Sequence, residues 1–171
     1  MIKTEAIILR KRSLPNQDLI VTFFTQDLGK INVIAKGVKK ITSRRLPHTQ
    51  TGNLVTILVN KKTDRFYLDG ISLISAFSLI KENQAKIQLL YFFFFILERL
   101  LPENQREEEI YRLTKKYLID LSKVSDPSSV DLTGYTNNLL KKLGYIKEDK
   151  PFDELKGVIQ DLINEPLPSF S

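Results

Sequence analysis

A chain of 171 residues with 42% hydrophobic residues can build one sizeable core or two small ones, which excludes a disordered protein. It has no cysteine and a single histidine, which excludes disulfides and thiolate metal sites and leads us to expect a cytoplasmic protein. The charge is uneven along the chain: residues 1–78 hold 13 Lys and Arg against 5 Asp and Glu, a net of +8, whereas residues 79–171 have a net of −2. The first part is therefore the candidate for contact with a polyanion, and ordinary surface charge stays the alternative.

The first 76 residues have the pattern of short strands separated by turns. Residues 26–29 end in glycine, which suits a tight turn with a positive φ. Strand patterns of β-branched and apolar residues cover residues 4–10, 19–25, 30–35, 54–59 and 65–76. Five short strands predict a small closed barrel, an arrangement that also protects the sheet edges.

Residues 36–52 form an irregular stretch between the third and fourth strands. Long loops inside a compact domain are usually functional or mobile, and this one concentrates positive charge without a nearby acid. Its cations predict a phosphate-binding arm: Lys36, Lys39, Lys40, Arg44 and Arg45. A second basic cluster stands at the end of the first strand, where a solvated strand end is an equally good interpretation: Arg10, Lys11 and Arg12.

Phe66 and Tyr67 are neighbours in the fifth predicted strand. Successive side chains of a strand point to opposite faces, so one of the two is expected to face outward. An exposed aromatic ring on a binding barrel can stack on a nucleic-acid base, while packing in the core or on the surface is the alternative.

From residue 79 onward the apolar residues recur with the period of a helix. The nine-residue apolar run at residues 89–97 is too short to span a membrane and indicates a buried helix. Capping residues, glycines and prolines predict helices at residues 87–101, 106–123, 126–143 and 153–164. The fold class is therefore α+β, with a five-stranded barrel in residues 1–78 followed by an all-α domain in residues 79–171.

Candidate catalytic groups are few. His48 stands next to a proline in the irregular stretch and is best explained as a surface residue. Glu107, Glu108 and Glu109 are best explained as acids at a helix start, where the helix dipole favours them. The chain has no P-loop and no plausible zinc ligand set, so we expect no catalytic residue, no metal and no cofactor, and we do not expect an enzyme.

Four ordered segments resemble the RecO family of recombination mediators. They are TEAIIL at residues 4–9, DLIV at 18–21 with the following Phe24-Thr25 and Gly29-Lys30, AKGVKK at 35–40 with Ser43-Arg44, and LLKKLGY at 139–145. The resemblance implies an OB-fold barrel followed by a helical domain. It further implies a non-enzymatic protein that binds single- and double-stranded DNA, anneals complementary strands, and helps to load RecA together with RecR and the single-stranded-DNA-binding protein.

The sequence departs from the family pattern in two places. Pro15-Asn16-Gln17 replaces the usual Gly-Glu near the first turn, which predicts a differently shaped loop. Lys147-Glu148-Asp149-Lys150 stands where many members carry a four-cysteine zinc segment, and one short helix follows. The resemblance therefore leaves open the functions housed in that segment, in particular docking of the acidic, Phe-ended tail of the single-stranded-DNA-binding protein. Two other classes stay open, an OB-fold RNA-binding protein and a helical interaction scaffold, with a hydrolase as a distant third.

Overall fold

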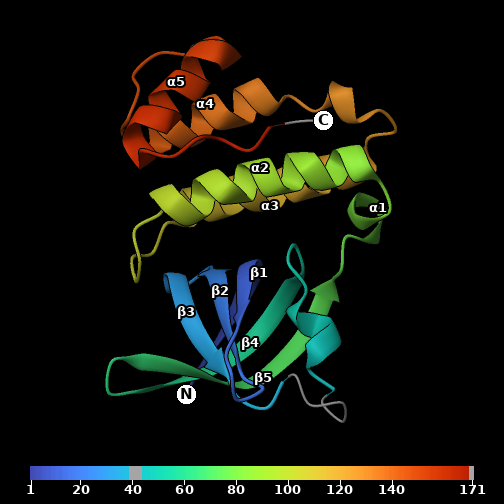
Figure 1. The fold of residues 1–171 in the computed structure, drawn as a ribbon, viewed down its shortest axis with the longest axis vertical. Helices are drawn as coiled ribbons and strands as arrows, with labels where there is room; N and C mark the ends of the chain where they lie inside the picture. Colours follow the sequence, from blue (N-terminus) through green and yellow to red (C-terminus); the bar gives the residue numbers. More distant parts are fainter. Residues whose placement is uncertain (39–43, 170–171) are drawn as a thin grey trace. The chain divides into compact units, whose positions relative to one another are not determined.

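The computed structural model describes residues 1–38 and 44–169. The chain divides into two compact units (Figure 1). The barrel unit consists of Met1–Phe77 together with the returning segment Pro102–Tyr111, and the helical unit consists of Ser78–Leu101 and the chain from Arg112 onward. Within residues 1–38 and 44–169, no helix is long and apolar enough to cross a membrane.

The barrel unit is a closed five-stranded barrel with the strand order β1-β2-β3-β5-β4. All neighbouring strands are antiparallel except β3 and β5, which pair in parallel at Val33–Phe66 and Ile34–Tyr67. The prediction of a five-stranded barrel followed by helices is confirmed. The strands are β1 (Ile2–Ser13), β2 (Leu19–Thr25), β3 (Gly29–Ala35), β4 (Leu54–Lys62) and β5 (Arg65–Ser75).

The alternation of side chains along each strand separates a barrel core from an outer face. Ile31, Val33 and Ala35 of β3 are fully buried in the core, while the intervening Asn32 is exposed. This period of two is the one that a half-buried strand requires. Between β3 and β4 the chain forms a short 3-10 helix, η1 (Leu46–Thr49), within the stretch that we expected to be irregular.

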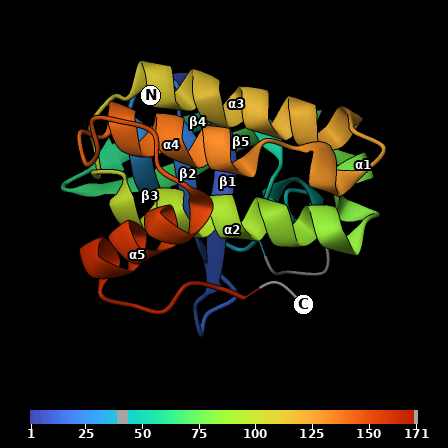
Figure 2. The same ribbon diagram turned by 90° about the horizontal axis from the view of Figure 1, so that it is seen from above.

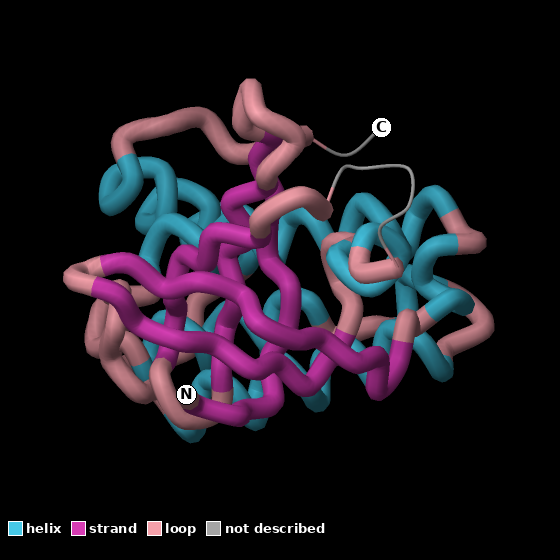
Figure 3. Tube along the Cα trace, turned by 90° about the horizontal axis from the view of Figure 1, so that it is seen from below, coloured by secondary structure: helices cyan, strands magenta, loops and turns pink. Residues whose placement is uncertain are grey.

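The β4–β5 hairpin extends past the part of β4 that pairs with β1. The β1–β4 pairing ends at Ile2–Val59, whereas β4 and β5 stay paired out to Lys62–Arg65. Figure 3 shows the two strands joined by the short turn at Thr63 and Asp64. The cationic side chains near this turn are therefore presented at the end of a two-stranded ribbon.

The β2–β3 turn accounts for the close approach of the returning segment. Gly29 has a φ of +72°, and a Cβ added there would lie 1.8 Å from the carbonyl oxygen of Gln105. The Asn104 N–H donates to the Lys30 carbonyl at 2.8 Å. Farther along the segment, the Tyr111 hydroxyl donates to Glu5 Oε1 at 2.7 Å, and its ring meets the Phe24 ring edge-on. A glycine is required at position 29 because both its conformation and its contacts exclude a side chain.

The helical unit is built around aromatic contacts between helices. Phe93 of α2 stacks on Tyr117 of α3 with ring centroids 4.3 Å apart, and Tyr135 of α4 meets both rings edge-on. Figure 2 shows α4 lying over α2 and α3, in agreement with these contacts. The helices are α1 (Ser78–Lys81), α2 (Gln84–Leu100), α3 (Glu108–Lys123), α4 (Leu132–Lys142) and α5 (Phe152–Ile163).

One predicted helix start was wrong. Asp126 caps only a short 3-10 turn, η2 (Pro127–Ser129), through its contact with the Ser128 N–H. Val130 then adopts an extended conformation, with φ −71° and ψ 128°, which interrupts the helical path. Asp131 supplies a second cap by accepting from the Gly134 N–H at 2.9 Å, and α4 begins at the next residue. Two consecutive capping motifs therefore divide the segment that we expected to be one helix.

Candidate nucleic-acid interface

A row of side chains crosses the outer face of four barrel strands. Arg12 of β1 is opposite Ile20 of β2, Ile20 is opposite Ile34 of β3, and Ile34 is paired with Tyr67 of β5. Directly opposite residues of paired strands share one face of the sheet. Arg12 is exposed and the other three side chains are half-buried, so this row is a partly apolar strip with a cation at one end.

A β-bulge decides which cations of β1 face outward. The β1–β2 register shifts between Ile8 and Arg10, so that Leu9 is an extra residue in the ladder. A bulge reverses the alternation of the side chains that follow it. Arg10 and Arg12 therefore share the outer face, while Lys11 points to the other side, where its Nζ donates to Gln50 Oε1 at 3.2 Å. The predicted cluster is thus divided between two faces of β1.

The β4–β5 hairpin and the turn after β3 bring further cations to this outer face. Lys62 and Arg65 form the last pair of the hairpin, on the same side as Tyr67. The Lys36 Nζ lies 5.2 Å from the centre of the Tyr67 ring, and the Lys62 Nζ lies 5.8 Å from it. We call the exposed cations of this surface the cationic face: Arg10, Arg12, Lys36, Lys62 and Arg65.

The basic stretch after β3 is tied to the barrel at both ends. The Gly37 N–H donates to Asp18 Oδ1 at 2.7 Å, with Gly37 at a φ of +66°. The Arg45 guanidinium donates to the carbonyl oxygens of Lys36 at 2.6 Å and Leu68 at 3.3 Å, so it holds the two ends of the stretch together. Arg44 is exposed. The other two predicted cations, Lys39 and Lys40, lie outside the described residues.

The two aromatic candidates of β5 lie on opposite faces. Phe66 is 9% exposed and belongs to the barrel core, because it pairs with Val33 of the inner face. Tyr67 lies on the outer face between the lysines of the cationic face. The interpretation of Phe66 as a stacking residue is therefore dropped, and Tyr67 remains the candidate.

The cations of the β4–β5 hairpin were missed in the sequence, where residues 61–64 only separate the predicted strands at 54–59 and 65–76. Lys61 lies on the other face of the hairpin from Lys62, with its Nζ 5.5 Å from the centre of the Phe66 ring. There it borders a hollow of about 310 Å³ that Arg106 also lines. The signal that could have identified the hairpin is the clustering of Lys61, Lys62 and Arg65 around a two-residue turn in a barrel whose β4–β5 loop commonly binds oligonucleotides.

An acidic side chain lies at the edge of the same outer face. Glu103 Oε1 accepts from Asn32 Nδ2 at 3.0 Å, and Asn32 Oδ1 accepts from the Thr22 hydroxyl at 2.7 Å. Thr22 is directly opposite Arg10 in the β1–β2 pair. The returning segment thus brings a carboxylate to the row next to that of Arg12, where it opposes the binding of an anion.

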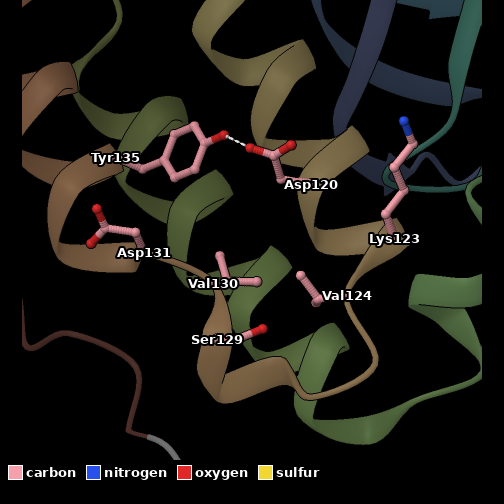
Figure 4. A pocket seen from close by; sticks show the side chains of 7 residues that line it. All are labelled: Asp120, Lys123, Val124, Ser129, Val130, Asp131 and Tyr135. Carbon is pink, nitrogen blue, oxygen red and sulfur yellow. Dashed lines mark hydrogen bonds between the residues drawn. The ribbon is translucent and has the colours of Figure 1, made fainter.

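A separate hollow of about 320 Å³ lies in the helical unit (Figure 4). The Tyr135 hydroxyl donates to Asp120 there, and burial, together with that carboxylate, raises the pKa of Tyr135, so its proton stays on the oxygen. The Asp131 carboxylate caps α4. Both carboxylates therefore serve the local structure. The lining is completed by Lys123, Val124, Ser129 and Val130.

In the described part of the chain, no group of three or more His, Asp or Glu side chains lies close enough together to hold a metal ion. His48 lies in η1, where its backbone N–H donates to the Arg45 carbonyl at 3.0 Å and its own carbonyl accepts from Asn53 Nδ2 at 3.1 Å. These hydrogen bonds use only the backbone of His48 and stabilise the conformation of the loop.

Comparison with known families matches both units of the chain. The model described as "Recombination protein O N terminal" matches residues 1–77, which contain the five strands of the barrel. The model described as "Recombination protein O C terminal" matches residues 82–147, which contain α2, α3 and α4. The two matches follow one another in the order of the family.

Individual relatives agree with the family models. The protein named DNA repair protein RecO of Caldanaerobacter subterraneus is 29% identical over 145 residues, which cover 85% of this chain and 59% of that protein. Those of Thermoanaerobacter sp. and Geobacter metallireducens are 26% and 27% identical and cover 86% and 84% of this chain, respectively. The chain spans 58–60% of the length of these three relatives. On these matches and on its barrel-plus-helix fold, the chain belongs to the RecO family of DNA repair proteins.

Proposed function

We propose that this chain binds DNA without sequence preference through the cationic face and acts as a non-enzymatic mediator of recombinational repair. The observation that carries the proposal is the convergence of five cations from β1, the turn after β3 and the β4–β5 hairpin on one outer barrel face. OB-type barrels commonly bind oligonucleotides on the β2–β3 face and the adjoining loops. The names of the relatives, which refer to DNA repair, support DNA as the nucleic acid.

Binding of this kind is expected to depend on phosphates. Lys and Arg side chains neutralise phosphates and release counterions, which gives affinity without information on the base sequence. If each of the five cations displaces one counterion from single-stranded DNA, the slope of log affinity against log salt is about −3 to −4. Lys39, Lys40 and Arg44 extend the proposed site along the basic stretch, and Arg45 maintains the geometry of that stretch.

The mediator role comprises annealing of complementary strands and assistance in loading RecA, with RecR and the single-stranded-DNA-binding protein as partners and a cytoplasmic, nucleoid-associated location. A cationic face that binds any sequence supports annealing, because it lowers the repulsion between two phosphate backbones. We propose double-stranded DNA as a second ligand of the same face, since phosphates are common to both forms.

The decisive experiment compares binding and annealing by the purified protein. Fluorescence anisotropy with single-stranded DNA, duplex DNA and RNA of matched length, between about 50 and 200 mM salt, gives the affinities and the slopes. A DNA-repair mediator should bind both DNA probes and accelerate annealing of complementary DNA strands. Tight binding of RNA without DNA annealing would favour the RNA-binding alternative, and the absence of nucleic-acid binding near physiological salt would favour an interaction scaffold.

A further inference from the structure

Tyr67 has an unusual setting for a residue of a barrel wall. Its half-buried ring lies on the outer face, and two ammonium groups from separate parts of the chain lie 5.2 Å and 5.8 Å from its centre. We propose that Tyr67, Lys36 and Lys62 form a clamp for one unpaired nucleotide, in which the base stacks on the ring and the two ammonium groups bind the flanking phosphates. This inference rests on the proposed function and specifies single-stranded DNA as the ligand of this part of the cationic face.

The backbone holds the three side chains of the clamp together. Parallel pairing sets Tyr67 beside Ile34 of β3, and Lys36 follows two residues later on the same face. Lys62 reaches the ring from the other strand of the hairpin, since Asn60 is the residue directly opposite Tyr67 and Lys62 lies two positions farther along β4. The hydrogen bonds of Gly37 to Asp18 and of Arg45 to Lys36 fix the turn from which Lys36 projects.

The chemistry of the clamp matches an unpaired nucleotide more closely than a paired one. A base inside a duplex is covered on both faces by its neighbours, so its face is not available to an aromatic side chain. An unpaired base has an open face, and every base has one, so stacking adds affinity without sequence preference. The cation–π contacts hold both ammonium groups over the ring in the free protein, so a stacking base displaces them from the ring face and they then lie close to its flanking phosphates.

The test measures discrimination between single strands and duplexes by the full chain. The probes are a labelled thymidine oligomer of about 16 nucleotides, the upper site size of one such barrel, and a duplex of the same length. Tyr67→Ala should weaken binding of the single strand by about 10-fold and binding of the duplex by less than about 2-fold, with the salt slope unchanged, because the ring contributes stacking and no charge. Tyr67→Phe should bind both probes like the unchanged protein.

Two further variants keep the proposal falsifiable. Tyr67→Leu retains an apolar side chain beside Ile34 and should lose the same affinity for the single strand, which separates stacking from loss of folding. Tyr145→Ala removes an exposed tyrosine of the helical unit, 45% accessible, and should leave binding unchanged. Equal losses on both probes, or no loss in either Tyr67 variant, would overturn the clamp while leaving the proposed function intact. Failure of the unchanged protein to bind either probe would instead refute the proposed function.

Discussion

Neutralising the cationic face should remove most of the salt dependence of DNA binding without unfolding the protein. The variant R12Q/K36Q/K62Q/R65Q removes four exposed cations that lie on one outer face of the barrel. Each phosphate contact contributes about 0.7 to the log–log slope for single-stranded DNA, so the slope should fall by about 3 and the affinity by about 100-fold near 200 mM salt. The loss should be the same for every base sequence, since the contacts are with phosphate.

The assay is fluorescence anisotropy over a range of salt concentrations, accompanied by thermal unfolding. The melting temperature should change little, because exposed charges contribute little to stability. The matched control, K116Q/K123Q/K142Q/K147Q, removes four exposed cations from the helical unit and should keep the slope of the unchanged protein. If the control variant lost binding while the cationic-face variant kept it, the assignment of the site to the barrel would be refuted.

Three further outcomes are expected. Glu103→Gln keeps an acceptor for Asn32 but removes the negative charge beside the Arg10–Thr22 pair, so DNA affinity at low salt should rise by about 2-fold. This is the effect of ~0.5 kcal/mol, the interaction energy of two unit charges about 8 Å apart in water. An unchanged or lower affinity in fluorescence anisotropy would contradict this prediction. Gly29→Ala should destabilise the protein by at least about 2 kcal/mol, because the residue has a positive φ and the added Cβ would overlap with the Gln105 carbonyl. The Tm should therefore fall by roughly 4–8 °C. A Tm equal to that of the unchanged protein would show that the returning segment can shift to make room. Because the chain has no cysteine, we expect no bound zinc, and chelators should leave the Tm unchanged. Stoichiometric zinc in elemental analysis would contradict this expectation.

The barrel could be predicted because its strands alternate regularly. Ile31, Val33 and Ala35 have the period of two that a half-buried strand imposes, and the turn at Gly29 has the glycine that a positive φ requires. The helical unit could be predicted to within a few residues for the same kind of reason, since its apolar residues follow the helical period. The exceptions were the short helix α1, which was not predicted, and the start of α4, where two capping motifs follow one another within a few residues and the first caps only a 3-10 turn.

The candidate site was less predictable, because it depends on strand register. Simple alternation from the buried Ile8 would direct Arg10 and Arg12 inward, and it is the bulge between Ile8 and Arg10 that directs them outward. The neighbourhood of Tyr67 likewise depends on the parallel pairing of β3 with β5, which joins residues more than 30 positions apart. Glu103 reaches the outer face only because the returning segment packs on the barrel, a long-range contact without a local sequence signal.

Strand annealing by the purified protein tests the central claim most directly. Complementary labelled DNA strands are mixed with the unchanged protein, with R12Q/K36Q/K62Q/R65Q or with K116Q/K123Q/K142Q/K147Q, and the rate of duplex formation is followed by fluorescence. A cationic face that mediates repair predicts acceleration by the unchanged protein and by the helical-unit variant, and a rate near that of free DNA for the cationic-face variant. Equal acceleration by all three proteins, or none by the unchanged protein, would contradict the account.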